Sequence, residues 1–317
     1  MRNTVVLCFM LSVIGQCSCV ESTTNNHPII GVLAQEKVLE SDPQLNTHVS
    51  YIAASYVKFL EGAGARIVPI MINKTDKYYE NITNHVNGVL LPGGDAQFDA
   101  PGGYSEAGRK LFDHAMKMNQ AGDYFPVLGI CLGFELLTFL AANNVEHRAR
   151  CFSYNEALPL QFTGSFFTSK LFGNAPSSTI GILGKENVTA NFHRYCLTEK
   201  NITELHLDEE WQFMTTNKDS DGLKFISSLE HKNYPLYGLQ FHPEKNIYEW
   251  KKGKVHPHSA NAIRVSQYFA NFFVNEARKN AHKFPIEPEE RIHLIYNYPA
   301  KYTIDRTVFE QCYEFEI

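Results

Sequence analysis

The sequence has 317 residues, of which 44% are hydrophobic and 20% are charged, a composition typical of globular proteins. A chain of this length can bury a sizeable core in one large α/β domain or in two small ones. Its formal net charge of −5 gives no basic surface for nucleic acid or for an anionic membrane, so neither partner is expected.

The N-terminus has the pattern of a secretory signal peptide. Arg2 precedes an apolar run over residues 4–14, and small residues lead to a predicted cleavage site after Cys19. The run is too short to span a bilayer, and the sequence has no other apolar run that is long enough. A buried N-terminal strand is the alternative interpretation. We predict that residues 1–19 are removed and that residues 20–317 form a single domain.

The next part of the sequence alternates between predicted strands and predicted helices. Strands are expected at 28–34, 65–72, 87–91 and 125–130, and helices at 49–62, 76–86, 105–120 and 133–142. Such alternation is typical of a parallel sheet that helices cover on both faces.

The pattern changes in the middle of the chain. From about 157 to 240, short runs of alternating apolar and polar residues predict antiparallel strands and hairpins. A long amphipathic helix is expected near 258–280, and the tail 284–317 is expected to wrap around the domain. The predicted fold is α/β, with a mostly parallel central sheet flanked by helices, an added antiparallel part and a C-terminal extension.

Four Asn-X-Thr sequons begin at Asn73, Asn81, Asn187 and Asn201. A single sequon often occurs by chance, but four sequons behind a signal peptide predict an N-glycosylated protein, with each used site at the surface.

Four cysteines remain after residues 1–19 are removed: Cys131, Cys151, Cys196 and Cys312. This number is too small for the disulfide framework of a small secreted domain. If Cys131 stays a free thiol, at most one disulfide can form among the other three, and the sequence leaves the pairing open.

Residues 126–141, "PVLGICLGFELLTFLA", contain a candidate nucleophile. A predicted strand leads into Gly-Ile-Cys-Leu-Gly and then into a helix, the pattern of a nucleophile elbow, in which Gly129 and Gly133 permit the sharp turn. The helix N-terminus is expected to lower the pKa of the Cys131 thiol. For an isolated motif of this kind, a cysteine packed in the core is the alternative.

The stretch "GVLLPGGDA" at 88–96 ends a second strand at the same predicted sheet edge. Acyl transfer needs backbone N–H groups that bind the oxyanion, and we assign this role to Gly94 and Leu132. By itself, the stretch would indicate only a tight turn.

The stretch "GLQFHPEKN" at 238–246 ends a third strand. Glu244 lies two residues after His242, so its carboxylate can hold one ring nitrogen while the other faces the Cys131 thiol. A lone histidine would more often be structural. The three stretches together favour a Cys-His-Glu triad of Cys131, His242 and Glu244.

These motifs, in this order, resemble those of the class I glutamine amidotransferase superfamily. The signal peptide, "CLGFE", "NFHRYCL" and "FHPEKN" are more closely similar to the gamma-glutamyl hydrolase family. The similarity covers essentially the whole mature chain.

The resemblance implies a cysteine hydrolase that cleaves the γ-glutamyl amide bonds of folate poly-γ-glutamates through a thioester. It implies no metal and no cofactor, a homodimer, and a location in the lysosome and outside the cell.

The resemblance also implies that His193, in "NFHRY", binds substrate. A protonated His193 would suit an anionic substrate in an acidic compartment. Arg194 and Lys245 are further candidates on charge alone, although such side chains are more often simply solvated. Glu135 lies one helical turn beyond Cys131 and is expected to border the substrate.

Two other functions remain open. Ammonia-generating members of the superfamily usually carry Gln four residues after the nucleophile, where this sequence has Glu135, and the sequence has no synthase domain that would use ammonia. A glutaminase is therefore the main alternative. A secreted binding glycoprotein without activity is the other, although all triad positions are intact.

Overall fold

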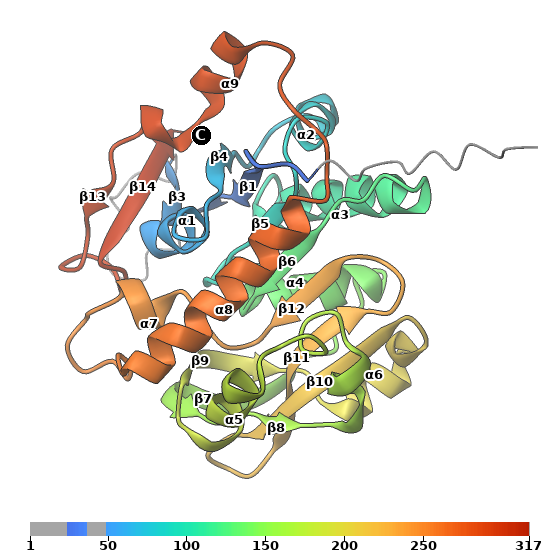
Figure 1. Ribbon diagram of the computed structural model, residues 1–317, viewed down its shortest axis with the longest axis vertical. Coiled ribbons are helices and arrows are strands. Elements are labelled where there is room, and N and C mark those ends of the chain that lie inside the picture. Colours follow the sequence, from blue (N-terminus) through green and yellow to red (C-terminus); the bar gives the residue numbers. More distant parts are fainter. Residues whose placement is uncertain (1–23, 37–48, 317) are drawn as a thin grey trace, which may run out of the picture.

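The computed structural model describes residues 24–36 and 49–316, and the predicted signal peptide lies outside these ranges. Its main sheet runs through the molecule (Figure 1). In spatial order, the strands of this sheet are β4 (Arg66–Ile70), β1 (Ile29–Leu33), β5 (Val89–Leu91), β6 (Val127–Ile130), β12 (Leu236–Leu239), β11 (Lys224–His231), β10 (Trp211–Lys218) and β8 (Gln161–Phe162). Neighbours from β4 to β12 are parallel, and β11, β10 and β8 continue the sheet in antiparallel pairs. The predicted mostly parallel sheet with an antiparallel part is confirmed.

Helices cover both faces of this sheet, as its buried strands require. Successive residues of a strand point to opposite faces, so Leu90 packs in one apolar cluster while Val89 and Leu91 pack in another. One cluster includes residues of α1 (Ala54–Glu61) and α8 (Ala260–Ala277), and the other includes residues of α2 (Asp76–Thr83), α3 (Tyr104–Gln120) and α4 (Leu132–Ala141). The parallel strands therefore end at an edge that lies between two packed layers.

The long helix α8 crosses one face of the main sheet (Figure 1). Ser259 begins it by accepting a hydrogen bond from the N–H of Ala262 at 3.1 Å. Val265, Phe269 and Phe273 recur at four-residue spacing and are buried against the sheet. Within the described part of the chain, α8 and the other helices lack the combination of length and apolar character needed to cross a membrane.

The predicted helix 49–62 is wrong in its first part. Val49–Ala53 is strand β3, and the helix begins only at Ala54. The burial of residues 49–52 alternates with the period of a strand, and the partner of β3 is β14 (Gln311–Glu316), far away in the sequence. The second sheet has the order β13 (Lys301–Tyr302), β14, β3 and β2 (Gln35–Glu36). The C-terminal tail therefore returns to the N-terminal part of the fold.

A third sheet pairs two strands that the sequence did not distinguish. β7 (Ala149–Leu158) and β9 (Thr189–Cys196) are antiparallel, and a disulfide joins Cys151 to Cys196. The remaining helices and short 3₁₀ turns are α5 (Ser177–Lys185), α6 (Glu199–Glu204), α7 (Lys245–Tyr248), α9 (Glu287–His293), η1 (Gly164–Thr168), η2 (Leu207–Glu209) and η3 (Ile295–Asn297).

Candidate active site

Cys131 lies at the sharp turn between β6 and α4. Its backbone has φ 52° and ψ −108°, a left-handed conformation that costs energy for a residue with a side chain. The turn needs its two glycines, because a Cβ on Gly133 would lie 1.9 Å from the Leu91 carbonyl oxygen and one on Gly129 would lie 2.4 Å from the Gly133 oxygen. The turn therefore has the strand-to-helix geometry of a nucleophile elbow.

His242 and Glu244 form a buried pair just after β12. The Nδ1 of His242 lies 2.7 Å from Oε1 of Glu244, and the two side chains are 5% and 0% exposed. When Glu244 is ionised, Nδ1 of His242 carries the ring proton and donates a hydrogen bond to the carboxylate. Nε2 is then the ring nitrogen that can accept a proton. The N–H of His242 donates to the Ala190 oxygen at 2.8 Å, so strand β9 fixes the backbone of this residue.

Gly93 lies between the side chains of His242 and Cys131, and both are close to it. A Cβ built on Gly93 would be 2.8 Å from Cε1 of His242 and 2.9 Å from Cβ of Cys131. The imidazole and the thiol therefore flank the same small space, which only a residue without a side chain leaves open. The Gly93 N–H donates to the Tyr56 hydroxyl at 2.9 Å, and this hydroxyl also lies 3.3 Å from Nδ1 of His242.

The two predicted oxyanion donors, Gly94 and Leu132, line the same part of the cleft as Cys131. Leu132 is the first residue of α4, and its N–H has no acceptor within the helix. In residues 24–36 and 49–316, neither this N–H nor that of Gly94 donates to another group. The side chain of Gln35 holds the Gly94 turn, because its Nε2 donates to the oxygens of Pro92 and Gly93 at 3.1 and 2.9 Å.

The charge states of the triad follow from its burial. Burial raises the pKa of the Cys131 thiol well above its ordinary value, and the nearby Glu135 carboxylate adds to this effect. This direction is opposite to the lowering that the sequence predicts from the helix N-terminus. Burial also lowers the pKa of His242, although Glu244 opposes it. For Glu244, burial alone would raise the pKa, but His242 and Lys245 outweigh burial and lower it. The thiol is thus protonated at rest, and His242 is neutral.

Glu135 lies on α4, within the same cleft as Cys131. Its Oε2 accepts a hydrogen bond from Nη1 of Arg148 at 2.9 Å, and its Oε1 accepts one from Nε2 of Gln240 at 3.1 Å. Burial nevertheless raises the pKa of Glu135 to about 7, because it outweighs both partners. Arg148 also pairs with Glu146 at 2.6 Å and lies over the ring of Phe98 at 4.2 Å.

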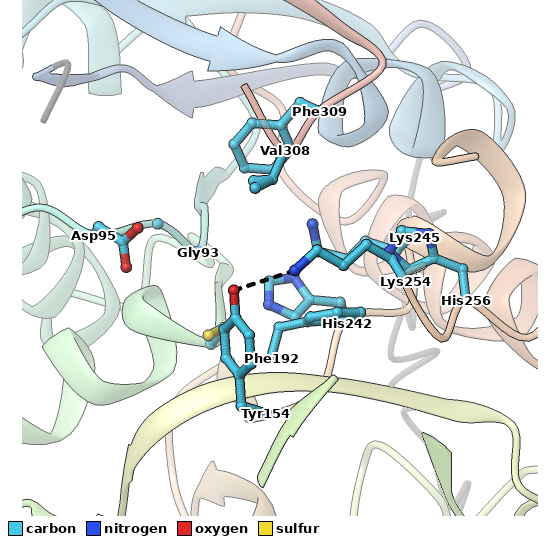
Figure 2. A pocket seen from close by; sticks show the side chains of 12 residues that line it. Gly93, Asp95, Tyr154, Phe192, His242, Lys245, Lys254, His256, Val308 and Phe309 are labelled. Carbon is cyan, nitrogen blue, oxygen red and sulfur yellow. Dashed lines mark hydrogen bonds between the residues drawn. The ribbon is translucent and has the colours of Figure 1, made fainter. Parts of the chain in front are cut away.

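Two connected parts of a cleft meet at Cys131. The smaller part, called here the His242 side, contains His242, Lys245 and Lys254 (Figure 2). The larger part, of about 1000 Å³, is called the Glu135 side and contains Glu135 and Arg148. The residues that line both parts are Gly94, Asp95, Cys131, Tyr154, Phe192 and Val308.

His193 lies on β9 and lines the Glu135 side, but its ring is buried among other groups of the chain. Nε2 lies 3.2 Å from Oδ1 of Asn191, and Nδ1 lies 3.1 Å from the Tyr195 oxygen. Burial lowers the pKa of His193 to about 3. The expected charged His193 is therefore not supported, because the ring stays neutral even at mildly acidic pH. A neutral role in substrate binding stays a prediction. Arg194 is exposed and lies over the Tyr154 ring at 5.2 Å.

One group of side chains in the described ranges has the composition of a metal site. The ligand atoms of Cys151, His193 and Cys196 lie within 4.8 Å of one another. Because the two cysteines form a disulfide, they offer no thiolate, and the group does not fit a metal in this state. Cys131 and Cys312 are free within the described residues, so the cysteine that the sequence assigns to catalysis is unpaired.

The four sequons differ in exposure. Asn73, Asn81 and Asn187 are exposed, whereas Asn201 is half-buried and caps α6. The Oδ1 of Asn201 accepts hydrogen bonds from the N–H and the hydroxyl of Thr198 at 3.0 and 2.6 Å. Glycosylation at all four positions stays a prediction, and Asn201 is the position with the least access.

The sequence did not indicate several residues of the site. Tyr56 and Gln35 support the triad and the Gly94 turn, yet they are far from both in the chain. Arg148 reaches Glu135 from a segment for which no element was predicted. Gln240 lies within the stretch "GLQFHPEKN". Because successive residues of a strand point to opposite faces of the sheet, Gln240 and Phe241 would be expected on different faces.

Comparisons with known proteins give the family. A sequence model described as Peptidase C26 matches residues 28–244. The chain is 42% identical to gamma-glutamyl hydrolase from Homo sapiens, over 92% of this chain and 91% of the human protein. It is 43% identical to gamma-glutamyl hydrolase from Rattus norvegicus, over 92% of this chain and 90% of the rat protein. A glutamine amido transferase structure from Methylobacillus flagellatus is 10% identical with a TM-score of 0.46, over 82% of this chain and 97% of that one. The chain therefore belongs to the Peptidase C26 family, together with the gamma-glutamyl hydrolases that it matches over most of its length.

Proposed function

We propose that this protein hydrolyses γ-glutamyl amide bonds, with Cys131 as nucleophile. The observation that carries the proposal is the buried His242–Glu244 pair, which shares with Cys131 the space that Gly93 leaves open. The names of the relatives supply the type of bond. Together they support a cysteine hydrolase.

The first half of the reaction forms a thioester. Nε2 of His242 takes the thiol proton as Sγ of Cys131 attacks the γ-carbonyl carbon. The carbonyl oxygen becomes an oxyanion, which the N–H groups of Gly94 and Leu132 bind. The C–N bond then breaks, and His242 gives its proton to the departing amine. Because burial holds the thiol protonated at rest, the attack requires this proton transfer.

The second half releases the acyl group. A water gives a proton to Nε2 of His242 and attacks the thioester carbon, and the same two N–H groups bind the second oxyanion. The C–S bond breaks, and the Cys131 thiolate takes the proton back from His242. In both halves, Glu244 orients the imidazole and stabilises its charged form.

The substrate class that we propose is folate poly-γ-glutamate. The Glu135 side of the cleft is large and carries the rings of Phe98, Phe139 and Tyr195, which suit a flat aromatic group. The His242 side carries lysines, which suit carboxylates. A chain with an aromatic head and several carboxylates matches both.

The cellular setting is part of the same proposal. The signal-peptide pattern of residues 1–19 and the exposed sequons support a glycoprotein of the secretory pathway, in the lysosome and outside the cell. A homodimer follows from the family resemblance. Expression in a secretory eukaryotic cell tests the setting, because processing near Cys19 and a gel shift on deglycosylation are expected.

The activity is tested by assaying two substrates on one preparation. Folate pentaglutamate should release glutamate or short γ-glutamyl peptides, which mass spectrometry identifies. Ammonia release from free glutamine should be at least roughly a hundredfold slower, since a free glutamine lacks the remote groups that the cleft contacts. Comparable kcat/KM values for the two substrates would favour the glutaminase instead.

A further inference from the structure

Among the described residues that line the His242 side of the cleft are two lysines and one carboxylate, Asp95, which also lines the Glu135 side. His256 also lines this part of the cleft, and burial lowers its pKa to about 3, so its ring is neutral. The lining therefore carries more cations than carboxylates, although the whole chain is acidic and the buried Glu244 lies behind His242. A positive end of a cleft attracts anionic ligands.

Lys245 is a buried ammonium on which the carboxylates of Glu244 and Glu249 act electrostatically, but neither carboxylate forms an ion pair with it. The residue is only 4% exposed, and within the described ranges its Nζ makes no hydrogen bond and no ion pair. Its described contacts are with aromatic faces, at 4.5 Å from the centre of the Phe309 ring and 5.5 Å from that of Phe192. Buried N–H donors without an acceptor are costly, so the ammonium of Lys245 can gain hydrogen bonds when an anionic ligand enters the cleft.

Lys254 is held over the same space by the loop that carries it. Asn155 of β7 donates to the Gly253 oxygen at 3.1 Å and accepts from the Val255 N–H at 2.8 Å, so the backbone is fixed on both sides of Lys254. Nζ of Lys254 donates to the Tyr154 hydroxyl at 3.3 Å (Figure 2). This neutral partner leaves the charge of Lys254 available to a ligand.

The position of His242 decides which part of a substrate reaches the lysines. His242 must protonate the leaving amine, and it lines the His242 side but not the larger part of the cleft. The leaving group therefore occupies the His242 side, and the acyl group occupies the Glu135 side. This assignment rests on the proposed function.

We propose that Lys245 and Lys254 form a carboxylate-binding subsite that holds the leaving glutamate of a γ-glutamyl substrate. The leaving residue carries at least two carboxylates close to its amine, and two cations next to His242 can bind them. Charge-assisted hydrogen bonds of this type are stronger than neutral ones. The subsite would select glutamate over neutral amines as the leaving group.

The test uses two substrates that share one acyl group. The first is Nα-benzoyl-γ-glutamyl-glutamate, and the second is the same compound with both carboxyls of the leaving residue capped as N-methylamides. We measure kcat/KM for the wild type, Lys245→Met, Lys254→Met, and Lys252→Met as the matched control. Lys252 is an exposed lysine of the same loop and does not line the cleft.

For the glutamate leaving group, we expect Lys245→Met and Lys254→Met each to lower kcat/KM about tenfold to a hundredfold. For the substrate with the capped leaving group, we expect Lys254→Met to change kcat/KM less than about threefold, because this leaving group has no carboxylate. Lys245→Arg should recover part of the loss with glutamate, and Lys252→Met should have no effect on either substrate.

Equal losses on both substrates in both lysine variants would overturn the proposal, because the lysines would then support the fold or the triad. An unchanged kcat/KM with glutamate would overturn it as well. If Lys245→Met does not fold, the two kcat/KM values of Lys254→Met decide whether the proposal holds. A wild type that cleaves neither substrate would refute the proposed function itself, which is a different result from a loss of discrimination.

Discussion

The two sides of the cleft handle charge in different ways. On the Glu135 side, Arg148 is paired with Glu135 and Glu146 and lies over an aromatic ring, so its positive charge is compensated within the chain. On the His242 side, Lys245 lies against aromatic rings and forms no direct ion pair within the described residues, although Glu244 acts on it electrostatically. Lys254 donates to a neutral hydroxyl.

This difference shows how one cleft can recognise a substrate with two unlike halves. A side whose charges are already paired contributes shape and aromatic surface, and it suits a flat acyl group. A side whose lysines form no direct ion pair can form new ones when an anion enters, and it suits a leaving group with carboxylates. The reaction takes place where the two sides meet, at Cys131.

The largest effect is expected when the His242 side loses its proton carrier. His242→Ala should lower kcat/KM for a γ-glutamyl substrate by on the order of 10⁴-fold, because nothing else can take the thiol proton. The double variant with Cys131→Ala should be little worse than either single variant, since the pair acts as one unit. Multiplicative losses would indicate that the two residues act independently.

The second largest effect concerns the wall that both sides share. The disulfide between Cys151 and Cys196 closes a loop with a sequence separation of 45 and ties β7 to β9. Cys151→Ala together with Cys196→Ala should lower the free energy of unfolding by about 4 kcal/mol, because the unfolded chain gains freedom. Denaturant unfolding measures this loss, with Cys312→Ala, a buried free cysteine, as the control. An equal loss in the control would assign the effect to packing.

A smaller effect is expected at the point where the two sides meet. Gly93→Ala places a Cβ between His242 and Cys131, so one of them must shift. We expect a loss of kcat of about a hundredfold with little change in folding, because a displacement of about 1 Å disrupts proton transfer. Gly181→Ala is the matched control, since a Cβ there meets no atom within 4 Å. Full activity of Gly93→Ala would contradict the triad geometry.

The smallest effect distinguishes the Glu135 side by its pH dependence. Because burial raises the pKa of Glu135 to about 7, the folded state binds its proton more tightly than the unfolded state does. The stability that this proton contributes is complete below the ordinary pKa of about 4.3 and is lost as the pH rises through about 7. Between pH 4.5 and pH 6, the wild type should lose on the order of 1–2 kcal/mol of its free energy of unfolding relative to Glu135→Gln. Parallel stability curves for the two proteins would contradict the raised pKa.

The sequence predicted those parts of the site that short segments encode. The elbow at Cys131, the turn at Gly94 and the pair His242 and Glu244 each depend on neighbouring residues, and parallel strands bring their ends to one edge. The contacts of Tyr56 and Arg148 depend on tertiary packing, which no local pattern encodes.

The difference between local patterns and tertiary packing also explains what the sequence missed in the fold. β3 was assigned to a helix because its partner β14 comes only at the end of the chain, and a strand without a visible partner resembles the start of the helix that follows it. The pairing of Cys151 with Cys196 was left open because three cysteines allow three pairs, and only the register of β7 on β9 selects one.

The most direct test of the central claim is the turnover of Cys131→Ala on a γ-glutamyl diglutamate substrate, measured as released glutamate. Alanine is a small substitution for the buried thiol, so we expect a folded protein, which circular dichroism and denaturant unfolding verify. We predict that kcat/KM falls by on the order of 10⁴-fold or more, because no other free thiol of the described residues lines the cleft. Substantial glutamate release by the folded variant would contradict the assignment of Cys131 as the nucleophile.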